Sequence, residues 1–146
     1  MNIHQNGVFS NAITVAAGAA GTSNLNGSEV DMQDFDSVVA IVSFGPIVSG
    51  AATSLNWQQD TATGMGSAAD LADTGITVAD TNDNTIFVMS LHKPLERFVR
   101  IQCDRATQNS TVSAVYYRYN AKSLGTTQSS DVTTTEHHVT PIEGTA

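Results

Sequence analysis

The sequence is poor in positive charge, and the little it has is confined to one stretch. No Lys or Arg occurs in the first 92 of its 146 residues, and all six basic residues lie between Lys93 and Lys122. With 14 carboxylates, the formal net charge is −8. Nucleic acids and anionic membranes are bound largely through Lys and Arg. The composition therefore argues against either of them as a general partner.

Other features that the sequence lacks narrow the class of protein further. The single cysteine, Cys103, excludes an intramolecular disulfide and fits a reducing compartment. No apolar run approaches the roughly 20 residues that span a bilayer. The N-terminus lacks the basic start and apolar core of a signal peptide, so we expect synthesis in the cytoplasm. A chain of 146 residues can bury about two thirds of its unfolded surface, which predicts one domain with a core that needs neither disulfide nor metal.

Short β-rich segments dominate what is present. Residues 37–44 (SVVAIVSF) are β-branched and almost wholly apolar, and Gly45-Pro46 follows them, which predicts a strand covered on both faces. Alternating patterns predict further strands over residues 28–33, 54–60, 76–79, 85–91, 97–105 and 111–119. Residues 66–73 are the best local helix candidate, but they fit a loop better than a framework helix.

Seven or so short strands without a long helix predict an all-β fold, a jelly-roll-like antiparallel β-sandwich. A β-barrel is the alternative architecture. We expect the sandwich to span residues 28–122. Residues 1–27, rich in Ala, Gly, Asn and Ser, and residues 123–146, rich in Thr and Ser, show little core-forming pattern. They are predicted to be extended N-terminal and C-terminal arms, serving as linkers or docking arms.

Motifs for metal binding are incomplete. Residues 80–84 (DTNDN) imitate the start of a calcium loop, but Thr85 stands where such a loop needs Gly and Leu91 where it needs Glu, so a turn is predicted. His137 and His138 are adjacent in the C-terminal arm, and adjacent residues of an extended segment point to opposite faces, which makes a shared zinc ion awkward. No metal or cofactor is predicted.

Catalytic motifs are absent as well. The chain has no recognisable nucleophile elbow, Walker loop or metalloprotease helix. Cys103 alternates with the apolar Val99 and Ile101, which predicts a buried and inert thiol rather than a nucleophile. We therefore expect a protein that is not an enzyme.

The order of several segments resembles a known group of proteins. "DFDSVVAIVSFGPI", "LNWQQD", "AADL", "DTNDNTIFVMSL", "RFVRIQC", a Val/Tyr-rich strand and the closing "VTPIEGTA" are similar to the small capsid cement or decoration proteins of tailed bacteriophages, over about residues 28–146. This resemblance implies a β-sandwich that forms a small oligomer, a dimer or trimer, and clamps neighbouring major capsid protein subunits. It also implies a location on the outer surface of the virion, after synthesis in the host cytoplasm, and no cofactor.

Two other functions stay open. "RFVRIQ" also resembles a strand of discoidin-like and other carbohydrate-binding modules, and Trp57 with Tyr116, Tyr117 and Tyr119 would then be a sugar-stacking platform. A hydrolase on a jelly-roll scaffold is the third hypothesis. It lacks any convergent set of histidines or carboxylates.

The sorted charge suggests where a partner would bind. Residues 93–122 carry a net charge of +4, from six basic and two acidic residues, whereas the first 92 residues carry nine carboxylates. We therefore expect one basic side of the sandwich, which would meet an acidic patch on a capsid subunit or the acidic first half of a sister chain. The residues expected to contact a partner are Trp57, Arg97, Arg100, Arg105, Tyr117, Arg118, Tyr119, His137, His138 and Ile142.

Overall fold

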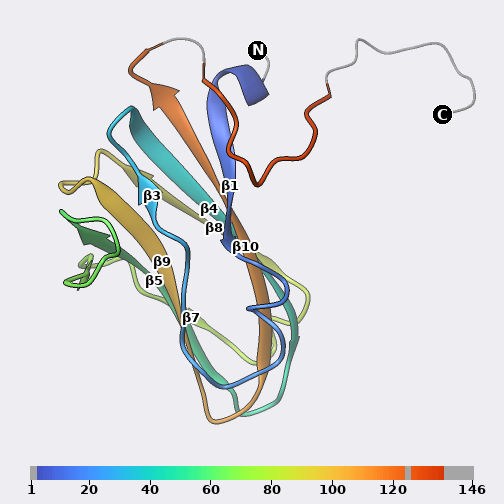
Figure 1. Ribbon diagram of the computed structural model, residues 1–146. Helices are drawn as coiled ribbons and strands as arrows, with labels where there is room; N and C mark the ends of the chain where they lie inside the picture. Colours follow the sequence, from blue (N-terminus) through green and yellow to red (C-terminus); the bar gives the residue numbers. More distant parts are fainter. Residues whose placement is uncertain (1–2, 124–125, 137–146) are drawn as a thin grey trace, which may run out of the picture.

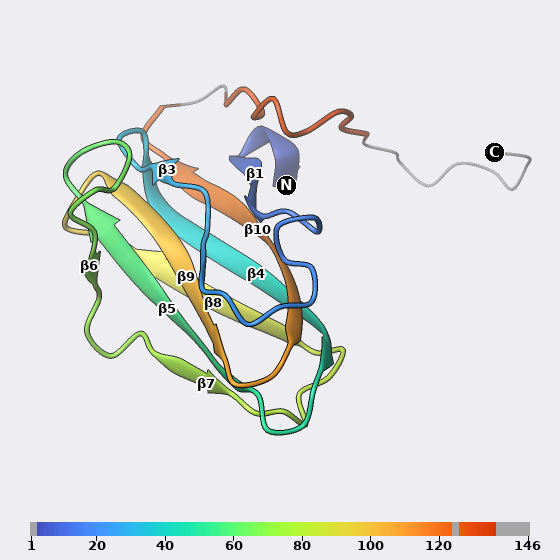
Figure 2. The same ribbon diagram turned by 60° about the horizontal axis from the view of Figure 1, so that its bottom comes forward.

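The computed structural model describes residues 3–123 and 126–136, which form two antiparallel sheets packed face to face (Figures 1 and 2). After a short 3-10 helix η1 (Ile3–Gln5), the strands are β1 (Gly7–Ile13), β2 (Leu25–Asn26), β3 (Val30–Asp31), β4 (Phe35–Ile47), β5 (Ala52–Asp60), β6 (Ala69–Asp70), β7 (Ile76–Val78), β8 (Ile86–His92), β9 (Phe98–Ala106) and β10 (Ser110–Ala121). The predicted fold class, an all-β antiparallel sandwich, is confirmed.

The chain crosses repeatedly between the two layers. Sheet A has the order β1-β10-β4-β8. Sheet B has the order β2-β9-β5-β6, with β3 also on β9 and β7 also on β5. The longest strands, β4 and β10, pair in the middle of sheet A, where Tyr117 lies opposite Val39. Sheet A therefore ends in two edge strands, β1 and β8.

Alternation places the core as expected. Val99, Ile101 and Cys103 of β9 are fully buried, as are Val38 and Val42 of β4. Trp57 of β5 is 1% exposed and stacks on Tyr116 of β10, with ring centroids 5.9 Å apart. Cys103 is fully buried, as predicted, and this burial raises the pKa of its thiol to about 12.

A hydrogen bond across the core joins the two sheets. The backbone N–H of Ile101 in β9 donates to the Tyr116 hydroxyl of β10 at 2.8 Å, and both residues are fully buried. Gly27, between β2 and β3, makes room for this contact, because a Cβ there would lie 2.6 Å from the Tyr116 hydroxyl oxygen. The space at Gly27, between β2 and β3, thus allows the Tyr116 side chain to accept a hydrogen bond from the backbone of β9.

The first 27 residues are not an arm outside the sandwich, so this expectation is wrong. Residues 7–13 form β1, which pairs with β10, and Val8, Ala12 and Ile13 are buried in the core. Residues 25–26 form β2 on β9. The apolar pattern of these two segments is too weak to predict strands from the sequence. Each strand is stabilised by pairing with residues about 80 to 110 positions later in the chain.

The C-terminal segment also lies against the sandwich, as far as it is described. The first part of residues 126–136 runs beside β1 in Figure 1, and the segment then turns away from the sandwich. Gln128 is hydrogen-bonded to the backbone of Gly7 and Phe9, and Asp131 to that of Asn11. These contacts are made by side chains.

Residues 66–73 contain no helix; they form a loop that includes β6. Carboxylates hold the adjoining turn in place. Asp60 accepts hydrogen bonds from the backbone N–H groups of Ala62 at 3.0 Å and Ser67 at 2.9 Å, and these bonds lower its pKa. Glu29 accepts one from the Gly64 N–H at 2.6 Å.

Candidate docking surface

The outer faces of the two sheets differ in chemistry. On sheet B, Arg100 donates to Gln58 at 2.8 Å, and Gln58 donates to Asp70 at 2.8 Å and to Gln102 at 3.1 Å. Asn56 donates to the same Asp70 oxygen. These polar side chains satisfy one another and also face water, as an exposed sheet surface normally does.

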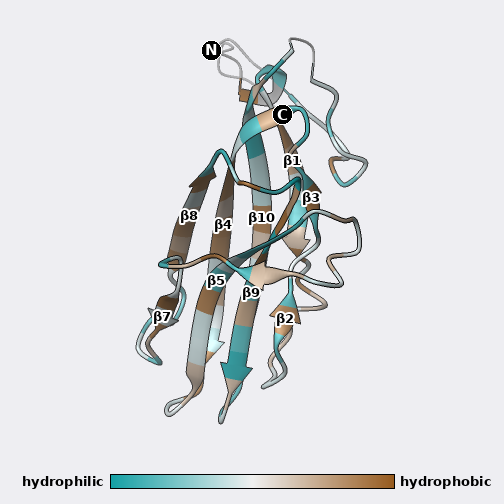
Figure 3. Ribbon diagram, turned by 90° about the vertical axis from the view of Figure 1, so that its left-hand side faces the viewer, coloured by the Kyte–Doolittle hydropathy of each residue, from teal (hydrophilic) through white to brown (hydrophobic). Residues whose placement is uncertain are grey.

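The outer face of sheet A has aliphatic and aromatic side chains among four serines, an asparagine and a histidine, and it carries no fixed charge. Alternation and register place these side chains on it: Gly7, Phe9 and Asn11 of β1, Ser113, Val115, Tyr117 and Tyr119 of β10, Ser37, Val39, Ile41 and Ser43 of β4, and Ile86, Val88, Ser90 and His92 of β8. None is Lys, Arg, Asp or Glu. We call this surface the apolar face. In Figure 3, β4 and β8 are brown over much of their length, which marks them as hydrophobic.

Several large side chains of the apolar face are open to solvent. Ile86 is 65% exposed, Val88 63% and Val115 40%. Register places Val88 beside Ile41, and Ile41 beside Val115, so an apolar row crosses three strands. Contiguous exposed apolar surface makes this row a candidate interaction site.

Aromatic rings occupy the other end of the apolar face. Tyr117 stacks on Tyr119 with centroids 5.7 Å apart and planes 6° apart, and Phe9 lies 4.5 Å from Tyr117. The Tyr117 hydroxyl donates to the Ile3 carbonyl at 2.8 Å, which holds η1 over this end. Partial burial raises the pKa of Tyr117. Tyr117 and Tyr119, both predicted as partner-binding residues, therefore lie side by side on one half-exposed surface.

Four of the six basic residues come close together, because Lys93, Arg97 and Lys122 line one pocket and Arg118 lines another that shares Phe35 with it, but acidic side chains lie among them. Arg97 makes a two-point ion pair with Asp31, at 2.9 and 2.6 Å, and this hydrogen bonding lowers the pKa of Asp31. Lys122 donates to the Gln33 carbonyl at 2.7 Å and lies 4.0 Å from Asp36. The basic residues were expected to bind the acidic first half of a sister chain. Arg97 and Lys122 instead contact acidic residues of that half within the same molecule.

Arg105 is buried, so the expectation that it binds a partner is wrong. It is 4% exposed and continues the inward row of Val99, Ile101 and Cys103. Its guanidinium donates to three backbone carbonyls, those of Ala19, Ser23 and Ser110, each within 2.9 Å. Arg105 therefore anchors the segment between β1 and β2 to the sandwich.

Trp57 cannot serve as a sugar platform in this fold. Its ring is buried against Tyr116 between the sheets, whereas Tyr117 and Tyr119 face outward from sheet A. The four aromatic residues grouped in the carbohydrate hypothesis therefore divide into a buried pair and an outer pair. The expected role of Trp57 in partner binding is wrong, because its side chain belongs to the core.

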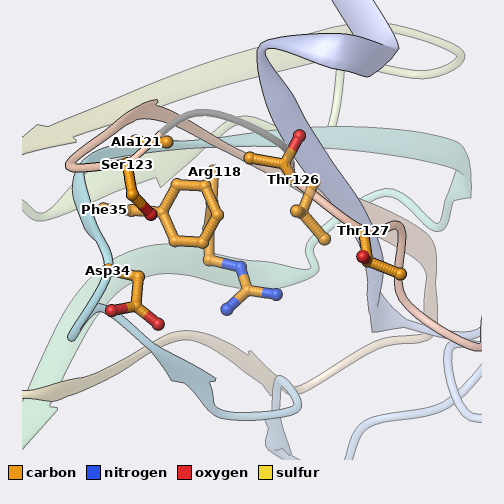
Figure 4. Close-up of a pocket in the computed structure, with 8 residues that line it drawn as sticks. Asp34, Phe35, Arg118, Ala121, Ser123, Thr126 and Thr127 are labelled. Atoms are coloured by element: carbon orange, nitrogen blue, oxygen red, sulfur yellow. The ribbon is translucent and has the colours of Figure 1, made fainter.

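Arg118 lies in a pocket at one end of the sandwich (Figure 4). The pocket has a volume of about 230 Å³ and is also lined by Asp34, Phe35 and the C-terminal residues Thr126 and Thr127, among others. The Arg118 guanidinium lies over the Phe35 ring at 5.0 Å and donates to the Asp31 carbonyl at 2.9 Å. Burial lowers the pKa of Arg118. These contacts give it a structural role beneath the C-terminal segment.

A serine and a histidine come together near the aromatic end of the apolar face. The Ser37 hydroxyl lies 2.7 Å from Nδ1 of His92 and also accepts a hydrogen bond from Asn120 at 3.0 Å. A nucleophilic serine must be reached by its substrate. Ser37 is fully buried, so this pair joins β4 to β8 and offers no open catalytic site.

The predicted turn over residues 80–84 binds the neighbouring loop. Asp83 accepts a hydrogen bond from the Ile47 N–H at 2.6 Å, and Asp80 accepts one from the Gly50 N–H at 2.8 Å. Within residues 3–123 and 126–136, no group of three or more His, Cys, Asp or Glu side chains is placed to hold a metal ion. The same residues include no helix long and apolar enough to cross a membrane. His137, His138 and Ile142 lie outside the described residues.

Comparison with known proteins adds little. No protein-family model matches the sequence, and no curated protein matches it. Among solved structures, the chain is similar to the VP2 protein in a subviral particle of infectious bursal disease virus, with 10% identity and a TM-score of 0.23. The match covers 81% of this chain and 40% of that one, so the chain spans less than half the length of VP2. A TM-score this low carries no argument about fold or function.

The sequence analysis did not single out Val39, Ile41, Ile86 and Val88 as surface residues. The signal was present in residues 37–44, which have apolar residues on both faces and were expected to be covered on both. The sandwich covers one of those faces. The other is the apolar face.

Proposed function

We propose that this protein is a structural virion protein that binds the assembled capsid lattice of a tailed phage as a cement or decoration protein, and that the apolar face is its docking surface. The observation that carries the proposal is that Val39 and Ile41 lie at the centre of the outer side of β4, where the second sheet does not cover them, beside the exposed Val88 and Val115. An antiparallel sheet normally turns a polar face to water. Sheet B does so with charged and amide side chains, whereas the outer face of sheet A has a row of exposed aliphatic side chains and no fixed charge.

The size of the apolar face suits a repeated lattice. Four strands about 4.8 Å apart and about seven residues long, at about 3.3 Å each, give a surface of roughly 20 by 23 Å. This is about 450 Å² in plan, below the roughly 800 Å² that each partner contributes to a standard stable interface. A contact of this size is weak alone, but it becomes effective when many copies bind a regular shell.

Cementing follows from the preference for the assembled form. A protein that binds neighbouring subunits in the shell better than loose subunits stabilises the shell by its binding free energy. This role requires no catalytic group and no cofactor. The major capsid protein would be the partner, and the outer surface of the capsid the location.

The absence of charge on the apolar face gives the proposal a specific test. Purified protein is co-sedimented with expanded capsids that were assembled without it, over a series of salt concentrations. We expect binding that is almost independent of salt, because burial of uncharged apolar surface is not screened by ions. No binding at any salt concentration would count against the proposal. Binding that falls steeply with salt would move the docking site to the basic residues.

The carbohydrate alternative retains the stacked pair Tyr117 and Tyr119 as a possible platform. It predicts that the protein binds glycans on an array and that Tyr119→Ala abolishes this binding. Such a result would replace the lattice proposal, whereas an array without binding would leave the lattice as the partner to test.

A further inference from the structure

The outer edge of β1 is covered by side chains rather than by a strand. The C-terminal residues 126–131, which we call the strap, run beside this edge (Figures 1 and 2). Thr126 donates to the Gln5 carbonyl at 3.1 Å. Gln128 donates to the Gly7 carbonyl at 2.7 Å and accepts from the Phe9 N–H at 2.9 Å, and Asp131 accepts from the Asn11 N–H at 3.0 Å.

The strap reproduces the bonding of a neighbouring strand. In a parallel pair, one residue donates its N–H to the carbonyl on one side of its partner and accepts from the N–H on the other side. The Gln128 amide does this to Gly7 and Phe9, on either side of Val8. Thr126 and Asp131 continue the series to Gln5 and Asn11, in the same chain direction. The backbone of β1 therefore presents its outer hydrogen-bonding groups in regular strand spacing.

The edge itself lacks the usual protection against pairing. Natural edge strands are blunted by Lys, Pro, bulges or a covering segment. The β1 sequence, GVFSNAI, contains no charged residue and no proline. Its bulge lies at its far end, between Asn11 and Ile13. The strap is the protection that remains.

We propose that the edge of β1 is a strand-pairing site for a second copy of this chain, and that the strap controls access to it. Antiparallel pairing about a two-fold axis at Phe9 places Phe9 opposite itself and Gly7 opposite Asn11, so every outward group meets a partner. Two copies of sheet A then form one continuous sheet of eight strands. The fit to a second copy follows from this symmetry and from the lack of charge on β1, which lets two chains of net charge −8 approach at this edge.

The strap and the second copy exclude each other. Both need the Gly7 carbonyl and the N–H groups of Phe9 and Asn11. The inference concerns a sheet edge rather than the apolar face, and it does not depend on the proposed function. The two can therefore fail separately.

The test weakens the strap in the full-length chain. In Gln128→Ala/Asp131→Ala, all three hydrogen bonds between the strap and β1 are lost, and only the one from Thr126 to Gln5 of η1 stays. The association constant for dimers should therefore rise by at least about tenfold over wild type. Light scattering after gel filtration, over a series of concentrations, measures this change. Thr133→Ala/Thr134→Ala, in the same segment but outside the strap, is the matched control and should behave as wild type.

A second measurement locates the contact. Hydrogen exchange of the Phe9 and Asn11 amides should be fast in the dilute strap variant and slow at concentrations where it dimerises. Adding Asn11→Pro, which removes an outward donor and is tolerated on an edge strand, should restore the monomer. A strap variant that associates no more than wild type would overturn the proposal. So would dimers that leave Phe9 and Asn11 unprotected, or oligomers larger than dimers.

Discussion

The hydrogen bond between Tyr116 and Ile101 should be worth a measurable part of the stability of the sandwich. In Tyr116→Phe, the Ile101 N–H stays fully buried and loses its acceptor. Leaving a buried donor unsatisfied costs about 1–3 kcal/mol. For a urea m-value of about 1–3 kcal/mol/M, a loss of about 2 kcal/mol lowers the unfolding midpoint by roughly 1 M.

The assay is urea denaturation followed by the fluorescence of Trp57, the single tryptophan of the chain, which stacks on residue 116. Tyr119→Phe is the matched control, because Tyr119 is on the apolar face and its hydroxyl has no hydrogen bond to the described residues. Its midpoint should stay near that of wild type. Equal midpoints for Tyr116→Phe and wild type would refute the view that this bond holds the sheets together.

Three further predictions concern buried and paired groups. Arg105→Met should lower the free energy of unfolding by at least about 3 kcal/mol in the same urea assay, because three carbonyls lose a charged donor. Arg97→Met removes a solvent-exposed ion pair and should lower it much less. Equal decreases for the two variants would contradict the structural role of Arg105. Cys103 should react with a thiol reagent at pH 8 only as fast as the protein unfolds, because burial raises its pKa to about 12; rapid labelling of the native protein would argue against that burial. The pKa of Asp31 is lowered, so its contribution to stability is complete above its ordinary pKa of 3.8 and is lost as the pH falls through its folded pKa. In Asp31→Asn, the free energy of unfolding should therefore fall less over that pH range than in wild type. An unchanged pH profile of stability would contradict this prediction.

The sequence predicts which side chains face inward more reliably than which segments pair. Strict alternation in β9 and β10 places Val99, Ile101, Cys103 and Tyr116 in the core correctly. The same alternation includes Arg105 in the inward row, but its charge suggested a surface position. Only the carbonyls brought by the segment between β1 and β2 explain how a charged side chain is accommodated there.

The N-terminal strand and the candidate site depend on contacts between distant residues. β1 has a weak pattern of its own and is defined by its partner β10, more than a hundred residues later. The pattern of β4 has apolar residues on both faces, but the sequence alone does not indicate which of the two faces packs against sheet B. The charge sorting along the chain does not produce a purely basic surface, because the acidic residues around β3 lie beside Arg97 and Lys122.

The central claim is that the apolar face binds the capsid, and one pair of variants tests it most directly. Val88→Lys places a charge at the β8 end of the apolar row formed by Val88, Ile41 and Val115. Thr77→Lys places the same charge at an exposed position on β7 of sheet B. Both variants should fold. In co-sedimentation with expanded capsids, Val88→Lys should lose most of the binding while Thr77→Lys binds as wild type. If Val88→Lys binds as wild type, or Thr77→Lys is the variant that fails, the apolar face is not the docking surface.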